Sequence, residues 1–266
     1  MSARSRRTDA GADHGNGGDK RRRTWRILNK TTVYRTSVSR RSLSGMCGRY
    51  VLYGPQSRYQ AYFDTKYWPD FADRYNIAPT SVVPVIRQSP EGERVADLLK
   101  WGLIPHWAKD PSIGLKLTNA RAESLTEKPS FRDAFKRRRC IVPASGFYEW
   151  KAESTGKQPY YIRLKSEEPL AMAGLWESWR EPDGVVVRTF CIITTEANAL
   201  MAQIHDRMPV LLRPGDFGQW LDPGVPGEDL RKLLGPYPTD PMEAWPVSKA
   251  VSRASNEGVE LINRPA

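Results

Sequence analysis

From residue 46 onward, apolar residues come in short runs separated by glycine and proline, and this pattern predicts a β-rich chain. The runs are rich in β-branched and aromatic residues, which favour a pleated backbone. The expected strands are residues 47–53, 81–88, 95–104, 140–151, 159–165, 170–179, 185–195 and 207–212. Residues 89–93 and 181–185 have the composition of turns, and the second segment resembles a hairpin connection.

Helical patterns are few and short. The candidates are residues 57–64, 195–204, 215–222 and 227–235. We expect Ser57 to cap the first of these helices and Thr195 to open the second. No repeat of 20 to 50 residues is visible. The pattern predicts a single α+β domain over residues 46–266, built on a mostly antiparallel, barrel-like β-sheet with a few short helices.

Positive charge is concentrated in the first part of the chain. The 266 residues carry a formal charge of +11, yet residues 1–45 alone hold 12 lysines and arginines against 3 acidic residues. This leader has little to bury, so we expect it to be disordered. We expect the working protein to begin near Met46, after an upstream start codon or a removable extension. No apolar stretch of about 18 residues is present, so we expect no membrane span.

The three cysteines are Cys47, Cys140 and Cys191, and no pair has CxxC spacing. A zinc ribbon or a thioredoxin-type motif is therefore not available, and we expect no metal and no other cofactor. Cys140 and Cys191 lie in apolar runs, which predicts two buried thiols. The odd number of cysteines is typical of a protein in the reducing cytoplasm.

Glu149 is the acidic residue with the most unusual predicted surroundings. Strand alternation puts Phe147 and Glu149 on one face, with Tyr148 and Trp150 on the other. A carboxylate flanked by large aromatic residues is expected to lose solvent, which raises its pKa and suits it to general acid catalysis. The alternative is an ordinary surface carboxylate on an amphipathic strand.

Two further segments carry polar side chains that can do chemistry. His205 lies where a predicted helix passes into a strand, although it can also be a structural histidine paired with Asp206. Asn119, Arg121 and Glu123 alternate along the chain, so all three point one way if the segment is extended. An amide beside a guanidinium can hold a phosphate or a sugar oxygen. The alternative is an exposed polar edge strand.

The Met46–Cys47 pair suggests a specific chemistry if the chain is processed there. A cysteine at the N-terminus carries a thiol and an α-amine on adjacent carbons. With an aldehyde, the amine forms an imine and the thiol closes a five-membered thiazolidine ring. The α-amine is partly unprotonated at neutral pH, since its reference pKa is about 7.7–8.0. This chemistry requires the removal of Met46.

Nine motifs occur in order along the chain: MCGRY, RYNIAPT, WGLIPHWAKD, TNARAES, CIVPASGFYEWK, MAGLWE, IITTEAN, IHDRMPVLL and WPVSKAV. Together they resemble the SRAP family of SOS response-associated peptidases, or abasic-site processing proteins, from about Met46 to Ile262. The resemblance implies the SRAP fold. It also implies a sensor that links covalently to abasic sites in single-stranded DNA and shields them.

The resemblance also assigns roles to individual residues. Cys47 is the nucleophile, Asn119 positions the sugar, Glu149 assists ring opening of the sugar, and His205 transfers protons. The implied DNA-binding residues are Arg49, Trp107, Arg121 and Arg207. The three arginines hold flanking phosphates, and the tryptophan offers a surface on which a base stacks.

The family name further implies self-cleavage that exposes Cys47, so we expect autopeptidase activity together with lyase-type Schiff-base chemistry. Expected partners are single-stranded DNA with abasic sites and replication-fork proteins. We expect a monomer in the cytoplasm, associated with the nucleoid and with no membrane partner. Two alternatives remain: a cysteine peptidase that acts in trans, and a non-catalytic single-stranded DNA-binding protein.

Overall fold

The structure, a computed structural model, describes residues 48–265, which belong to one compact unit. Met46, Cys47 and the leader residues lie outside the described residues, and so do the predictions made for them. Within residues 48–265, no helix is both long enough and apolar enough to span a bilayer.

Five antiparallel strands form the first sheet, in the order β12-β8-β7-β1-β2. Their bounds are β1 Arg49–Leu52, β2 Arg74–Ile77, β7 Gly146–Glu153, β8 Gly156–Leu164 and β12 Met242–Pro246. Strand β7 is central, with Arg49 of β1 opposite Tyr148 and Tyr160 of β8 opposite Glu149. The predicted strand 140–151 is therefore two strands, β6 (Arg139–Ala144) and β7, which separate at Ser145 and enter different sheets.

The second sheet closes on itself as a barrel. Its ring consists of β3 Val82–Gln88, β4 Arg94–Trp101, β6 Arg139–Ala144, β9 Leu170–Arg180 and β10 Val186–Glu196. Pairing runs β10-β4-β3-β6-β9 and returns to β10, and only β10–β4 is parallel within the ring. Two short strands, β5 Asn119–Arg121 and β11 Arg207–Pro209, add to β10. The predicted α+β fold with mostly antiparallel, barrel-like sheet is confirmed.

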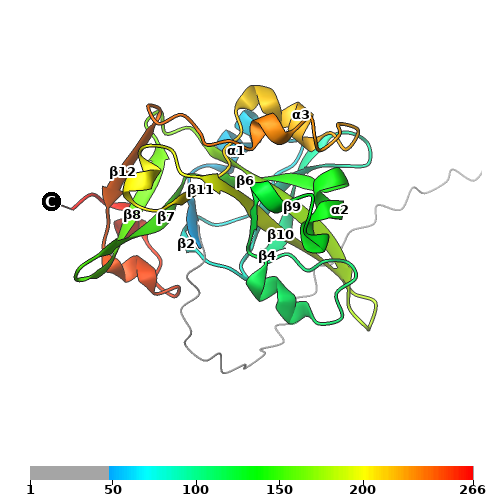
Figure 1. Cartoon of the computed structure of the whole chain (residues 1–266), viewed down its shortest axis with the longest axis horizontal. Coiled ribbons are helices and arrows are strands. Elements are labelled where there is room, and N and C mark those ends of the chain that lie inside the picture. The colour runs from blue at the N-terminus through cyan, green and yellow to red at the C-terminus, as the bar shows by residue number, and fades with distance from the viewer. Residues whose placement is uncertain (1–47, 266) are drawn as a thin grey trace, which may run out of the picture. The chain divides into compact units, whose positions relative to one another are not determined.

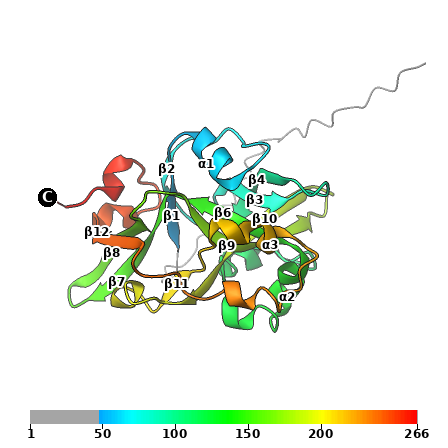
Figure 2. The ribbon, with the colours of Figure 1, turned by 90° about the horizontal axis from the view of Figure 1, so that it is seen from above.

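Figures 1 and 2 show the two sheets at different ends of the described unit, with β12, β8 and β7 at one end and α2, β9 and β4 at the other. The α-helices are α1 Gln56–Phe63, α2 Pro129–Arg137 and α3 Phe217–Leu221. The 3-10 helices are η1 Pro111–Lys116, η2 Ala122–Ser124, η3 Met201–Gln203, η4 Pro214–Asp216, η5 Arg231–Leu233, η6 Lys249–Ser252 and η7 Val259–Ile262.

Three helix predictions need correction, and one of them is residues 227–235, where the structure has turns and bends and only the short 3-10 helix η5. Pro55, and not Ser57, is the N-cap of α1, and it makes no side-chain cap. The helix expected over 195–204 is wrong, because β10 continues to Glu196, where it pairs with Arg207 of β11. Backbone pairing in the sheet overrides the local helical pattern, and only η3 remains of that helix.

The five-stranded sheet is covered on both faces. One face belongs to the main core, which includes Phe147, and the other packs a second cluster that includes Tyr148. That second cluster is covered by the C-terminal segment, through Val247, Val251 and Leu261. Residues 146–149 of β7 lie between two apolar layers, so a polar side chain there is desolvated wherever it points, whereas the end of the strand near Glu153 is exposed.

Candidate functional site

Glu149 lies on the central strand of the first sheet and is only 3% exposed. The predicted alternation is confirmed, because Phe147 packs in the main core while Tyr148 and Trp150 pack in the second cluster. The alternative of a surface carboxylate is therefore excluded. Burying a carboxylate costs free energy unless its oxygens are compensated, and such groups are often placed for function.

The chain enters the site beside Glu149. Arg49 is paired with Tyr148, so the same antiparallel register continued by one residue brings Gly48 opposite Glu149. The guanidinium of Arg49 donates from Nη1 to Asn76 Oδ1 and to the Val251 carbonyl, both at 2.9 Å. Burial lowers the pKa of Arg49. Arg49 thus fixes the start of β1 to the C-terminal segment.

Asn76 was not singled out as a site residue from the sequence, although it lies in the RYNIAPT motif. It is fully buried, and its Nδ2 lies within 3.1 Å of the carbonyl oxygens of Val251, Arg253 and Asn256. One amide therefore joins β2, Arg49 and the C-terminal segment. Only the folded structure reveals this role, since the carbonyls are about 175 residues away along the chain.

Asn119 and Arg121 lie on β5, which runs parallel to β10 with Asn119 opposite Ile192 and Arg121 opposite Thr194. Arg121 is exposed, whereas Asn119 is partly buried and donates to Thr118 Oγ1 at 3.4 Å. The expectation that Glu123 points with them along an extended segment is wrong, because η2 begins at Ala122. The chain bends there, and Glu123 turns to a different partner.

That partner is Arg207, the first residue of β11. Its two terminal nitrogens donate to the two carboxylate oxygens of Glu123 at 2.6 and 2.9 Å, and Nη2 also donates to the Thr194 carbonyl at 2.8 Å. The hydrogen bond from Arg207 is the largest cause of the lowered pKa of Glu123. With its side chain 13% exposed, Arg207 is a partly buried member of a bidentate ion pair.

His205 lies in the turn between η3 and β11. The backbone N–H of Arg207 donates to Nδ1 at 3.1 Å, so Nε2 carries the hydrogen in the neutral imidazole. The same Nδ1 lies 3.0 Å from Asp206 Oδ1, a carboxylate that can stabilise the protonated ring. The two arrangements give His205 a partner in each protonation state, which suits a residue that transfers protons.

Trp107 lies in the loop between β4 and η1 and is 49% exposed, although the loop around it is firmly held. Ile104 N–H donates to Thr189 Oγ1 at 2.9 Å, and Trp179 Nε1 donates to the Ala108 carbonyl at 2.8 Å. A large exposed aromatic ring on an anchored loop can stack on a base with little loss of conformational entropy.

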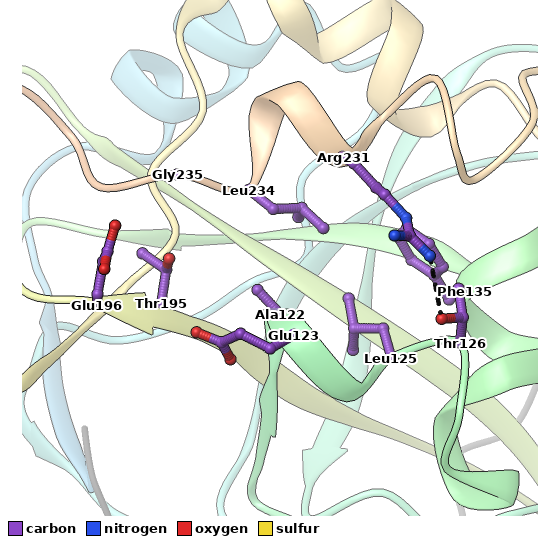
Figure 3. A pocket seen from close by; sticks show the side chains of 10 residues that line it. All are labelled: Ala122, Glu123, Leu125, Thr126, Phe135, Thr195, Glu196, Arg231, Leu234 and Gly235. Carbon is purple, nitrogen blue, oxygen red and sulfur yellow. Dashed lines mark hydrogen bonds between the residues drawn. The ribbon is translucent and has the colours of Figure 1, made fainter.

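An open cavity of about 350 Å³ borders the Glu123–Arg207 pair. Figure 3 shows the side chains around it, which come from η2 and the turn after it, α2, the end of β10, and η5. Its lining consists of Ala122, Glu123, Leu125, Thr126, Phe135, Thr195, Glu196, Arg231, Leu234 and Gly235. Of these, only Glu123 was singled out from the sequence as a candidate site residue.

The remaining thiols take no part in the site. Cys140 and Cys191 are buried in the main core, as predicted, and burial raises the pKa of both thiols. Within residues 48–265, no group of three or more His, Cys, Asp and Glu side chains is arranged to hold a metal ion.

The predicted residues that the structure describes therefore fall into two groups, with Trp107 apart from both. Arg49 and Glu149 belong to the first sheet, and Asn119, Arg121 and Arg207 flank β10, with His205 close to its end. The segment between β10 and β11, which contains His205, contacts the first sheet, because Asn198 Nδ2 lies 3.3 Å from Met242 Sδ at the start of β12. Trp107 belongs to a separate loop that is attached near the start of β10.

Comparison with known proteins identifies similar sequences over almost all of this region. The family model described as SOS response associated peptidase (SRAP) matches residues 46–254. Abasic site processing protein YoaM from Bacillus subtilis is 44% identical over 223 residues, which is 82% of this chain and 98% of that protein. Abasic site processing protein HMCES from Xenopus tropicalis is 34% identical over 235 residues, covering 73% of this chain and 69% of the other.

A solved crystal structure has a similar fold. A protein from Bacteroides thetaiotaomicron superposes with a TM-score of 0.76 at 28% identity, and the match covers 83% of this chain and all of that chain. The architecture of two sheets with short helices is therefore shared with an experimentally determined structure.

Proposed function

Since the chain belongs to the SRAP family, we propose that it captures abasic sites in single-stranded DNA as a covalent adduct of Cys47. Removal of Met46 leaves the α-amine of Cys47 free. The amine condenses with the ring-opened deoxyribose aldehyde to an imine and releases one water, and the thiol then adds across the C=N bond. The product is a thiazolidine that shields the lesion.

The observation that carries this proposal is the position of Glu149 relative to the start of β1. Cys47 lies outside the described residues, but it is bonded to Gly48, and consecutive Cα atoms are about 3.8 Å apart. The register of β1 with β7 brings Gly48 opposite Glu149, which is 3% exposed. A buried carboxylate close to the start of β1 can exchange protons with a sugar bound there while little water competes.

The other residues have roles that follow from their surroundings. In this proposal Asn119 orients the sugar, and His205 moves protons during imine formation and its reversal. Exposed Arg121 holds a phosphate, and Trp107 stacks on a base. Arg49 and Arg207 already have protein partners, so they act mainly by holding β1 and the end of β10 while adding positive charge.

The proposal includes self-cleavage before Cys47, which the family description as a peptidase supports. We infer that the basic leader is absent from the active form, because an acylated nitrogen cannot form an imine. We also propose that the protein acts as a monomer in the cytoplasm, on nucleoid DNA, near stalled replication forks.

The test uses a single-stranded oligonucleotide with one uracil, converted to an abasic site by uracil glycosylase. Protein is produced from a start codon at Met46, so that removal of this methionine leaves Cys47 as the first residue. It is incubated with the oligonucleotide, and the products are separated on a denaturing gel. We expect a heat-stable shifted band with the wild-type sequence and none with Cys47→Ser. Serine retains the α-amine and nearly the same shape, so binding of undamaged single strands is expected to persist.

Other results would favour the two alternatives. Cleavage of unrelated peptides without any shifted band would favour a cysteine peptidase that acts in trans. Binding of single strands without a covalent product would leave a non-catalytic binding protein.

A further inference from the structure

The cavity beside η2 combines an apolar floor with a polar rim. Leu125 and Phe135 are each 1% exposed and belong to the main core, so they form the floor. The rim carries Glu123, Glu196 and Arg231, and Figure 3 shows Arg231 reaching across to Thr126. A volume of about 350 Å³ with apolar walls and a few polar groups is typical of a small-molecule site.

This cavity directly adjoins the expected path of the DNA. Arg121 is opposite Thr194, and two residues further along each chain lie Glu123 and Glu196, both on the rim. On β10, Thr194 and Glu196 are two strand residues apart, which is about 6.6 Å. If Arg121 holds a phosphate next to the lesion, the adjoining nucleotide therefore reaches the cavity.

The charges of the rim select the part of a nucleotide that fits. The negative charge of Glu123 is neutralised by Arg207. The charged groups that remain facing the cavity are the carboxylate of Glu196 and the guanidinium of Arg231. A carboxylate at the rim repels a phosphate. It accepts hydrogen bonds from the amino group of a base, as glutamate does with cytosine N4, while arginine donates to base oxygens or ring nitrogens.

We propose that this cavity binds the nucleobase of a nucleotide next to the abasic site and prefers a base with an exocyclic amino group, cytosine in particular, over thymine. The base lies against Leu125 and Phe135, its amino group donates to Glu196, and Arg231 donates to an acceptor on the base. The proposal rests on the proposed function, because it needs damaged single-stranded DNA at Arg121.

The test measures equilibrium binding without covalent chemistry. Fluorescent oligonucleotides carry tetrahydrofuran, an abasic analogue that cannot ring-open, with either cytosine or thymine as the 5′ or the 3′ neighbour. The full chain is titrated by fluorescence anisotropy at fixed salt. We expect about 5-fold tighter binding for cytosine at one of the two positions, the scale of one good base contact.

Two variants test whether the cavity itself, and not a general loss of negative charge, causes the preference for cytosine. Glu196→Gln keeps the shape but adds an amide donor that thymine O4 accepts, so the preference for cytosine is expected to fall to within about 2-fold. Glu127→Gln is the matched control, because Glu127 is an exposed carboxylate in the turn after η2, next to the lining residue Thr126, and does not itself line the cavity. Glu127→Gln is expected to retain the preference.

The outcomes distinguish this inference from the proposed function. Equal affinity for cytosine and thymine at both positions overturns the base site, even if natural abasic DNA is captured covalently. The same holds if Glu127→Gln removes the preference as fully as Glu196→Gln does. A preference that only Glu196→Gln removes, in a protein that forms no covalent product, supports the base site and rejects the thiazolidine chemistry.

Discussion

Glu149 is the residue whose substitution most directly tests the proposed chemistry. We expect Glu149→Gln to slow covalent capture by about 10²–10⁴-fold, because glutamine fills the same buried space but cannot exchange a proton. The measurement is the single-turnover rate of adduct formation at saturating abasic oligonucleotide. Affinity for the tetrahydrofuran analogue serves as the control and is expected to stay within a few-fold of wild type. A capture rate near wild type would mean that Glu149 is only structural.

Arg121 and Arg207 look alike in sequence, but their surroundings differ. Arg121 is exposed, whereas Arg207 is held by both oxygens of Glu123. We expect Arg121→Ala to reduce the slope of log affinity against log salt by about 0.7, the value for one phosphate contact on a single strand. Arg207→Ala is expected to leave the slope closer to wild type. Anisotropy titrations over a range of salt test both variants, and equal loss of slope would contradict this distinction.

The sequence predicted which residues belong to the site more completely than it predicted which residues they contact. Alternation along 147–150 was sufficient to place Glu149 on the face of Phe147, because a strand has a fixed period of two. The pairing of Glu123 with Arg207 could not be predicted, since it depends on the bend at η2 and on β5 and β11 flanking the same strand. Neither feature leaves a periodic signal.

At the scale of elements, the long strands were predictable, but only some of the short ones were. The expected strands 81–88, 170–179 and 185–195 correspond to β3, β9 and β10; β-branched residues are frequent in β3 and β10, and β9 contains two tryptophans. β2 and β12 are only 4 and 5 residues long and were missed. Helix α2 was also missed, although Pro129 at its first turn and the buried pair Phe131 and Phe135 were readable signals.

The loop that presents Trp107 depends on two glycines in backbone contact. A Cβ added to Gly114 would lie 2.8 Å from the Gly102 carbonyl oxygen, closer than such atoms can approach. We expect Gly114→Ala to push the two ends of the loop apart and to lower stability by about 1–3 kcal/mol, the usual cost of overpacking. Thermal unfolding and tryptophan fluorescence measure the two effects.

Gly215→Ala is the matched control for that variant, because a Cβ at Gly215 meets nothing within 4 Å. We expect its unfolding temperature and its affinity for single strands to equal those of wild type. If Gly114→Ala behaves in the same way, the loop is more adaptable than its hydrogen bonds suggest.

At the scale of the whole molecule, the two ends of the described chain pack together and are joined by hydrogen bonds. The C-terminal segment covers the second apolar cluster, and Asn76 and Arg49 join it to the strands at the start of the described region. Trp150, next to Glu149 on β7, donates from Nε1 to Ser252 Oγ at 3.0 Å. The placement of β1, and with it the approach to Glu149, therefore depends on residues some 200 positions away.

Covalent capture depends on which residue is the first of the protein, and intact mass measures this directly. Only molecules that begin at Cys47 have both a free amine and a free thiol on adjacent carbons. We expect the fraction of protein that captures abasic DNA to equal the fraction that begins at Cys47, as measured by intact mass. The adduct is expected to weigh the sum of protein and oligonucleotide less one water, because imine formation releases one water and ring closure releases none.

The control is the same preparation acetylated at its α-amine, which removes the nitrogen lone pair from reaction while the fold and the thiol remain. We expect the acetylated protein to bind the tetrahydrofuran analogue with unchanged affinity and to form no adduct. Complete capture by molecules that still carry residues before Cys47 would show that the bond to DNA forms elsewhere, because an amide nitrogen cannot form the imine from which the ring closes.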